Sequence, residues 1–156
     1  MGHVRYSGHL DATPEAAWEV VVRPERYPDW DPLFCRVTDV AGALDRPGAA
    51  FRGVLRIAGR QLDARIEAIS AERPRRLMLV GFAGPDLRFT WSWRFAPVGA
   101  GVEVSVELDY DLADNLAGDL ADLLFVERSI GRSVRTAVEN FGDLAKSLEA
   151  STAPVG

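Results

Sequence analysis

The sequence predicts an α+β fold in which one curved antiparallel sheet packs against a long C-terminal helix. Between residues 3 and 112, most segments alternate apolar and polar side chains and are separated by short turns containing Gly or Pro. This pattern is typical of consecutive antiparallel strands. From Leu120 onward, apolar residues recur at helical spacing instead. Because a sheet with one apolar face must bury it, we expect the helix to cover that face.

The first elements are a strand and one or two short helices. Residues 3–10 alternate and predict a half-buried strand. Thr13, followed by proline and glutamate, is typical of a helix start, because it supplies a hydroxyl cap before a proline in the first turn. We expect this helix to end at Pro24 and a short helix to follow at 24–27.

Six further segments of the chain show strand patterns, and we expect a sheet of about six to seven strands. They are 33–40, 49–58, 61–70, 76–83, 86–95 and 102–112. The long helix follows over about 30 residues, with Asp119 as its cap, Asp122 in its first turn and Lys146 near its end. We therefore expect residues 1–150 to form a single domain and residues 151–156 to form a tail.

Composition excludes several classes of function. The chain has 156 residues, 47% of them hydrophobic, and a net charge of −5 without a long basic run, which argues against a nucleic-acid partner. No segment approaches the roughly 20 apolar residues of a membrane span, so we expect a cytoplasmic protein. His3, His9 and Cys35 lack a surrounding ligand set, so we expect no metal and no cofactor.

The region "DATPEAAWEVVVRPERYPDWDP" resembles the opening of the START-like (SRPBCC, Bet v 1-type) superfamily, and within it the bacterial polyketide cyclase/dehydrase-like branch. Trp18 and the corner Tyr27-Pro28-x-Trp30-x-Pro32 carry the resemblance. It implies a helix-grip fold with a hydrophobic cavity between sheet and C-terminal helix. It implies no single activity, because folds and functions are not linked one to one.

The inward face of the predicted strands is almost entirely apolar, which favours a hydrophobic ligand with one or two hydroxyl or carbonyl groups. The residues predicted to contact such a ligand are Trp30, Phe51, Leu55, Ile66, Phe89, Trp91, Trp93, Tyr110, Glu127 and Gly131. For the aromatic members, packing in the core is the competing interpretation. We expect Trp30 to cover one end of the cavity while Asp29 and Asp31 remain in water.

Glu127 and Gly131 interrupt the apolar stripe of the long helix when its phase is counted from Leu120 and Leu123. An inward Glu127 can hold a ligand hydroxyl or act as a general acid or base. Alternatively, the helix bends at Gly131 and Glu127 reaches solvent. Phe125 and Val126 fall off the stripe, where they either cover an entrance or contact a second subunit of a homodimer.

Two functions follow from these patterns. The first is binding of a hydrophobic, aromatic or polyketide-like small molecule in the cavity, without catalysis. The second is a polyketide cyclase or dehydratase acting on a poly-carbonyl intermediate. The second requires a base and an enolate stabiliser, for which Glu127 and Tyr110 are the candidates.

Overall fold

The computed structural model describes residues 2–113 and 123–152, and it confirms the predicted α+β, helix-grip arrangement. Seven antiparallel strands form one sheet in the order β1-β7-β6-β5-β4-β3-β2. The strands are β1 Gly2–Leu10, β2 Phe34–Thr38, β3 Ala50–Ile57, β4 Arg60–Glu72, β5 Arg76–Ala83, β6 Leu87–Val98 and β7 Gly101–Leu112. Strands that follow each other in the sequence are neighbours in the sheet, except that β1 pairs with β7. The short connections therefore join neighbouring antiparallel strands, as predicted.

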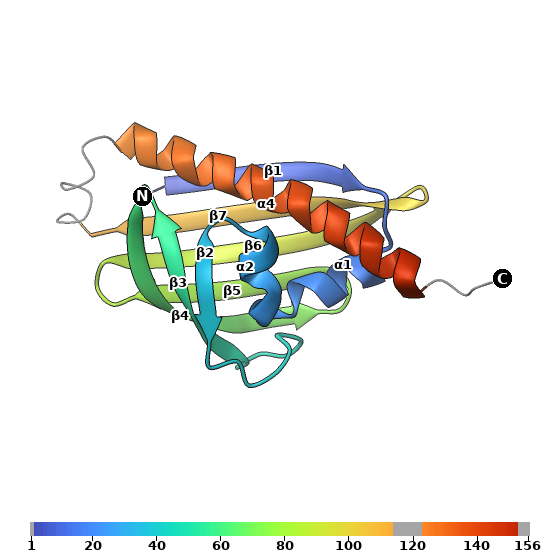
Figure 1. Cartoon of the computed structure of the whole chain (residues 1–156), viewed down its shortest axis with the longest axis horizontal. Coiled ribbons are helices and arrows are strands. Elements are labelled where there is room, and N and C mark those ends of the chain that lie inside the picture. Colours follow the sequence, from blue (N-terminus) through green and yellow to red (C-terminus); the bar gives the residue numbers. More distant parts are fainter. Residues whose placement is uncertain (1, 114–122, 153–156) are drawn as a thin grey trace.

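The helices all lie on the same face of the sheet (Figure 1). They are α1 Pro14–Val21, the 3-10 turn η1 Pro24–Arg26, α2 Tyr27–Trp30 and the long α4 Leu123–Thr152. The Thr13 hydroxyl accepts a hydrogen bond from the Ala16 amide at 3.1 Å, which confirms the predicted cap. The predicted features Leu120, Asp119 and Asp122 lie outside the described residues. The long helix continues through Thr152, two residues beyond the predicted domain boundary.

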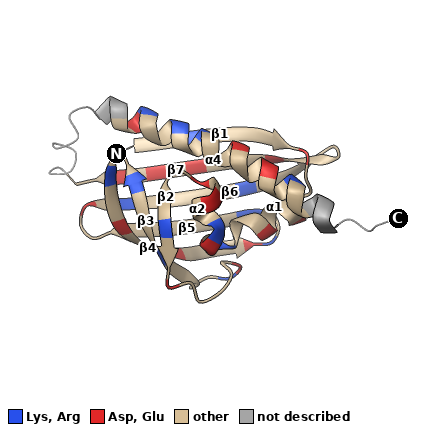
Figure 2. Ribbon diagram, in the orientation of Figure 1, with Lys and Arg blue, Asp and Glu red and all other residues tan. Residues whose placement is uncertain are grey.

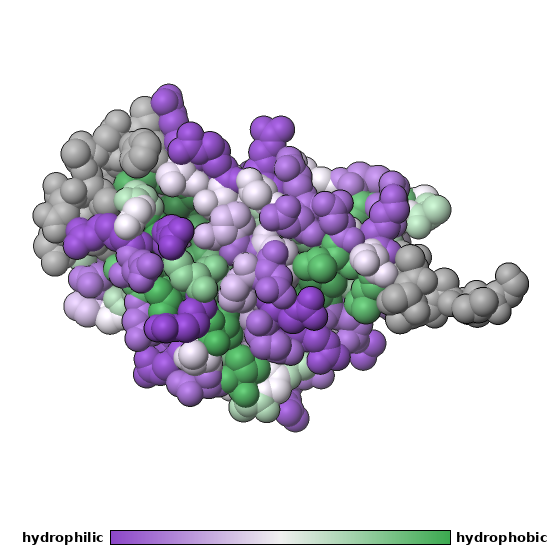
Figure 3. Space-filling view, in the orientation of Figure 1, coloured by the Kyte–Doolittle hydropathy of each residue, from purple (hydrophilic) through white to green (hydrophobic). Residues whose placement is uncertain are grey.

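The long helix α4 crosses the concave face of the sheet, close to β1 (Figure 1). Its buried side chains are Val126, Ile130, Val134, Ala137, Val138, Phe141 and Ala145. Their spacing of three or four residues places one stripe toward the sheet. The opposite face of α4 is hydrophilic, and charges of both signs are scattered over it (Figures 2 and 3). Among the described residues, no helix is long and apolar enough to cross a membrane.

The predicted phase of α4 was wrong by about one residue. Counting back from Val138 in steps of four gives Val134, Ile130 and Val126, all of which are buried. Val126 is therefore part of the stripe and does not lie at a surface for a second subunit, while Glu127 is exposed. The prediction took its phase from the first turns of the helix instead of from this long stripe. The side chain of Phe125 lies outside the described part of the chain.

Candidate functional site

The space between α4 and the sheet is filled by aromatic side chains at one end. We call this group the aromatic cluster; its members are Tyr27, Trp30, Phe34, Phe51, Trp91, Trp93, Phe95 and Phe141. Their ring centroids lie 5.1 to 6.3 Å apart, in edge-to-face, tilted and stacked pairs. This is the separation at which aromatic pairs attract each other beyond their area burial. The cluster leaves little room for a guest molecule.

Trp30 is a core residue of this cluster. Its indole is 1% exposed and meets Tyr27 at 5.1 Å, Phe141 at 5.2 Å and Trp93 at 5.6 Å. The backbone carbonyl of Trp30 accepts a hydrogen bond from the Asn140 amide at 3.1 Å, which ties α2 to α4. The stiff corner at 24–32 therefore delivers a large ring to the centre of the core.

Asp31, by contrast with the expectation that it remains in water, is 1% exposed. One carboxylate oxygen accepts a hydrogen bond from the Leu33 amide at 2.9 Å, which closes the turn after α2. The other oxygen is buried and has no hydrogen-bond partner within the part of the chain that the structure describes. Burial raises the pKa of Asp31 to about 7, against the lowering effect of the Leu33 hydrogen bond. The prediction failed because the local hydrogen bond draws the side chain inward, whereas Asp29 is exposed as expected.

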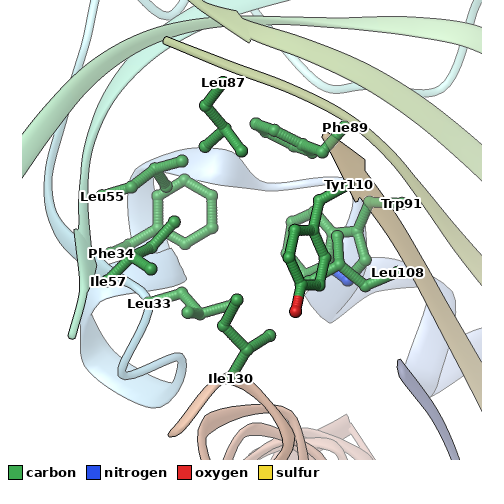
Figure 4. A pocket seen from close by; sticks show the side chains of 10 residues that line it. All are labelled: Leu33, Phe34, Leu55, Ile57, Leu87, Phe89, Trp91, Leu108, Tyr110 and Ile130. Atoms are coloured by element: carbon green, nitrogen blue, oxygen red, sulfur yellow. The ribbon is translucent and has the colours of Figure 1, made fainter. Parts of the chain in front are cut away.

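A cavity opens at the other end of the same space, beneath the first part of α4. Its volume is about 30 Å³, measured as the space open to the centre of a water molecule. The lining side chains, which Figure 4 shows converging from β2, β3, β6, β7 and α4, are Leu33, Phe34, Leu55, Ile57, Leu87, Phe89, Trp91, Leu108, Tyr110 and Ile130. A water needs two to four polar partners in such a site, which this lining does not provide.

Three aromatic side chains of this lining lie flat over glycines of a neighbouring strand. A Cβ atom on Gly81 would overlap the ring of Phe89, and one on Gly2 would overlap the ring of Tyr110. A Cβ atom on Gly53 would approach the ring of Phe34 to 3.0 Å. Gly81 and Phe89 are direct cross-strand partners, as are Gly2 and Tyr110. The rings of Phe89 and Tyr110, held down on the sheet in this way, leave the space above them open, whereas Phe34 also packs against Tyr27 and Trp91 of the aromatic cluster.

Among the lining residues, Tyr110 carries a hydroxyl group, which points toward α4 (Figure 4). Burial raises the pKa of Tyr110, and the negative charge of Glu127 raises it further. The phenol therefore stays protonated at neutral pH and can donate a hydrogen bond. Glu127 lies near enough to exert this effect, but its side chain is exposed and does not line the cavity.

The structure brings together four of the residues predicted to contact a ligand. Leu55, Phe89, Trp91 and Tyr110 all line the cavity. The other predicted core residues, which are fully buried outside the lining, are Trp30, Phe51, Ile66 and Trp93. Gly131 is partly buried on α4, and a Cβ atom there would meet none of the surrounding described residues within 4 Å.

Six lining residues were not among the predicted contacts: Leu33, Phe34, Ile57, Leu87, Leu108 and Ile130. Three of these, Ile57, Leu87 and Leu108, belong to the inward face that strand alternation predicts, so the pattern itself contained them. The missing signal was the position of each residue along its strand. The cavity lies toward the end of β3, the start of β6 and the end of β7, whereas the central positions fill the aromatic cluster.

Other potentially reactive groups are dispersed. His3 pairs with Asp109 and His9 lies 3.6 Å from Asp11, all at the surface, and Cys35 is half-buried in β2. Across residues 2–113 and 123–152, no three His, Cys, Asp or Glu side chains come together as metal ligands do.

Comparisons with known proteins agree with this architecture. The family model "Polyketide cyclase / dehydrase and lipid transport" matches residues 1–146. No curated protein matches the chain significantly. Among solved structures, TTHA0849 from Thermus thermophilus is 20% identical, with a TM-score of 0.77 over 97% of this chain and 99% of that one.

Two other solved structures share the fold at similar distance. A START superfamily protein from Mycobacterium smegmatis is 16% identical, with a TM-score of 0.74 over 95% of this chain and 99% of that one. The ZhuI aromatase/cyclase from Streptomyces sp. R1128 is 17% identical, with a TM-score of 0.73 over 97% and 98%. The chain is a member of the polyketide cyclase/dehydrase and lipid transport family.

Proposed function

We propose that this protein binds a hydrophobic small molecule, aromatic or polyketide-like, in the cavity beneath the first part of α4. The observation that carries the proposal is the lining itself, in which the ten described side chains are all apolar or aromatic and one of them, Tyr110, carries a hydroxyl group. Ligand sites of this kind combine an apolar wall with few polar groups that fix orientation. The family description, which names both cyclase/dehydrase and lipid transport, agrees with a hydrophobic ligand.

The ligand must enlarge the cavity as it enters. A volume of about 30 Å³ accommodates one or two water molecules at most, far less than a ring system. Six of the ten lining residues are Leu or Ile, whose side chains can change rotamer without breaking a hydrogen bond. The rings of Phe34, Phe89 and Trp91 offer faces and edges on which a flat ligand can stack.

The Tyr110 hydroxyl supplies orientation. A phenol is protonated at neutral pH and can donate a hydrogen bond, which suits a carbonyl or hydroxyl oxygen on the ligand. A single net hydrogen bond contributes about 0.5–1.5 kcal/mol, so it selects an orientation while apolar contact supplies most of the affinity.

A cyclase or dehydratase activity is the alternative function. Its support is the proximity of a carboxylate, Glu127, to the Tyr110 phenol, as the effect on the Tyr110 pKa indicates. An aldol step needs a base within hydrogen-bond reach of the substrate. Glu127 is exposed outside the lining, and binding requires no such group, so we favour binding.

The test is a fluorescence titration of the full chain with 1,8-dihydroxyanthraquinone, a flat aromatic molecule with carbonyl and hydroxyl groups. We expect saturable binding that is lost in Ile130→Trp, because the indole fills the cavity. Ile69→Trp is the matched control, since Ile69 is 45% exposed on the sheet. Tyr110→Phe should weaken binding by up to about tenfold.

Folding of each variant is checked by circular dichroism, and Leu108→Phe replaces Ile130→Trp if the latter unfolds. Binding that is equally tight in the wild type, the cavity variant and the control would exclude the cavity as the site. Turnover of a poly-carbonyl surrogate that disappears in Glu127→Gln, with binding retained, would establish the enzymatic alternative.

A further inference from the structure

A second hollow lies on the outer face of the sheet, away from α4. Its volume, measured as for the cavity, is about 320 Å³. It is lined by Arg5 and Ser7 of β1, Ser105 and Glu107 of β7, and Ser92 and Arg94 of β6. These three strands are direct neighbours in the sheet (Figure 1).

The strand register arranges the six residues in two rows. Glu107 is the cross-strand partner of both Arg5 and Ser92, and Ser105 is the partner of both Ser7 and Arg94. Three short serines surrounded by two arginines and a glutamate form a depression with a hydroxyl floor and long side chains at its rim. The hydroxyls of Ser7 and Ser105 lie 3.1 Å apart, so one donates to the other and the second proton is free to point outward.

The charges around this hollow are unbalanced. Arg5 donates from Nε to a Glu107 carboxylate oxygen at 2.8 Å and also from Nη2. Arg94 lies directly opposite Arg76 on β5, and like charges in this position repel each other. Among the described residues, Arg94 has no ion-pair partner, and the buried Nε of Arg76 donates no hydrogen bond.

We propose that this outer hollow binds a phosphate group. Two guanidinium groups against one carboxylate leave a formal charge of +1 in the lining, on a chain whose net charge is −5. Arg76, outside the lining, faces Arg94 on one side and Glu72 of β4 on the other. A phosphate oxygen can accept hydrogen bonds from Arg94 and from the serine hydroxyls, and its charge offsets the repulsion between Arg94 and Arg76. Glu107 opposes the anion, but its charge is partly compensated by Arg5. The site is separate from the cavity and does not depend on its function.

The test uses phosphorus NMR of inorganic phosphate and pyrophosphate with the full chain at constant ionic strength. We expect saturable binding that weakens about tenfold in Arg94→Met, because a charge-assisted hydrogen bond is lost. Arg56→Met removes the same charge from an exposed outer position on β3 and should leave binding unchanged. Glu107→Gln should tighten binding, while Glu103→Gln, elsewhere on β7, should not.

Equal affinity in wild type and Arg94→Met would overturn the proposal, as would a Glu107→Gln effect no larger than that of Glu103→Gln. The second comparison still tests the proposal if Arg94→Met fails to fold. Co-sedimentation with phosphatidylcholine vesicles, with and without phosphatidic acid, identifies the source of the phosphate. Vesicle binding that depends on phosphatidic acid and is sensitive to Arg94→Met assigns a lipid headgroup, whereas binding of free phosphate alone assigns a soluble phosphate ester.

Discussion

The two ends of the space beneath α4 are built from similar residues with opposite results. In the aromatic cluster, rings meet other rings at 5.1 to 6.3 Å and fill the space. In the cavity, Phe89 and Tyr110 lie over Gly81 and Gly2, and the space above them stays open. The difference depends on what each ring has beside it on the sheet. A hollow in a hydrophobic core can therefore be produced by glycines on neighbouring strands rather than by special lining residues.

The largest expected difference is in the stability lost when one aromatic ring is removed from the aromatic cluster or from the cavity. Phe141 is 0% exposed and contacts Trp30, Trp93 and Phe95, so Phe141→Ala should lower the free energy of unfolding by about 3–5 kcal/mol. Phe89→Ala should cost about 1–2 kcal/mol less, because one side of that ring already faces the cavity. Urea denaturation of both variants measures the difference. Equal losses would mean that the two ends are packed alike.

Asp31 allows a second comparison, because it is a buried ionisable group next to Trp30 of the aromatic cluster. Its folded-state pKa, raised to about 7, means that the native state holds the proton more tightly than the unfolded state. Stability attributable to Asp31 is therefore highest at low pH, and falls as the pH rises from the unfolded pKa through about 7.

Asp31→Asn removes this titration while keeping an oxygen that can accept from the Leu33 amide. We expect the stability advantage of the variant over the wild type to grow by roughly 2–3 kcal/mol between about pH 5 and 8. Asp29→Asn is the matched control, because Asp29 is exposed. A pH-independent difference between Asp31→Asn and wild type would show that Asp31 is ionised throughout this range.

Strand alternation was sufficient to predict the sheet and its inward face, because a side-chain period of two is set locally by the backbone. The position of the cavity was not predictable in this way, since it depends on which strand ends meet. Gly81 and Gly53 lie within predicted strands, where glycine signals a close approach of another group. Asp31 was predicted to be exposed, but its carboxylate accepts a hydrogen bond from the amide of Leu33, two residues further on, and is held inside the protein. Of the two placements considered for Glu127, the inward one was wrong, because the helix phase was extrapolated from one end rather than fitted to the whole stripe.

Gly81→Ala tests whether the glycine keeps the cavity open. The added Cβ atom would overlap the ring of Phe89, which can move away only by lifting off the sheet toward the cavity. We expect a loss of about 1–3 kcal/mol in stability, as for other overpacked cores, together with weaker anthraquinone binding. The double variant Gly81→Ala, Phe89→Leu should recover much of both losses. If the single variant binds as tightly as wild type, the ring has another way to move and the glycine does not determine the cavity.

The smallest expected effect comes from Gly131 and Gly142, two interior glycines of α4. Gly131 lies next to Ile130 of the cavity, and a Cβ atom on it would meet no surrounding residue of 2–113 and 123–152 within 4 Å, whereas one on Gly142 would lie 2.6 Å from a methyl group of Leu10. Alanine in the middle of a helix is favoured over glycine by up to about 1 kcal/mol. Gly131→Ala should therefore raise the free energy of unfolding by that amount, without changing ligand affinity because Gly131 lies outside the lining. In Gly142→Ala, the clash with Leu10 should cancel this gain in the free energy of unfolding, because Leu10 is 8% exposed and has little room to move. Thermal unfolding of both variants measures this difference, and equal stabilisation would mean that α4 is no more tightly held against β1 at Gly142 than at Gly131.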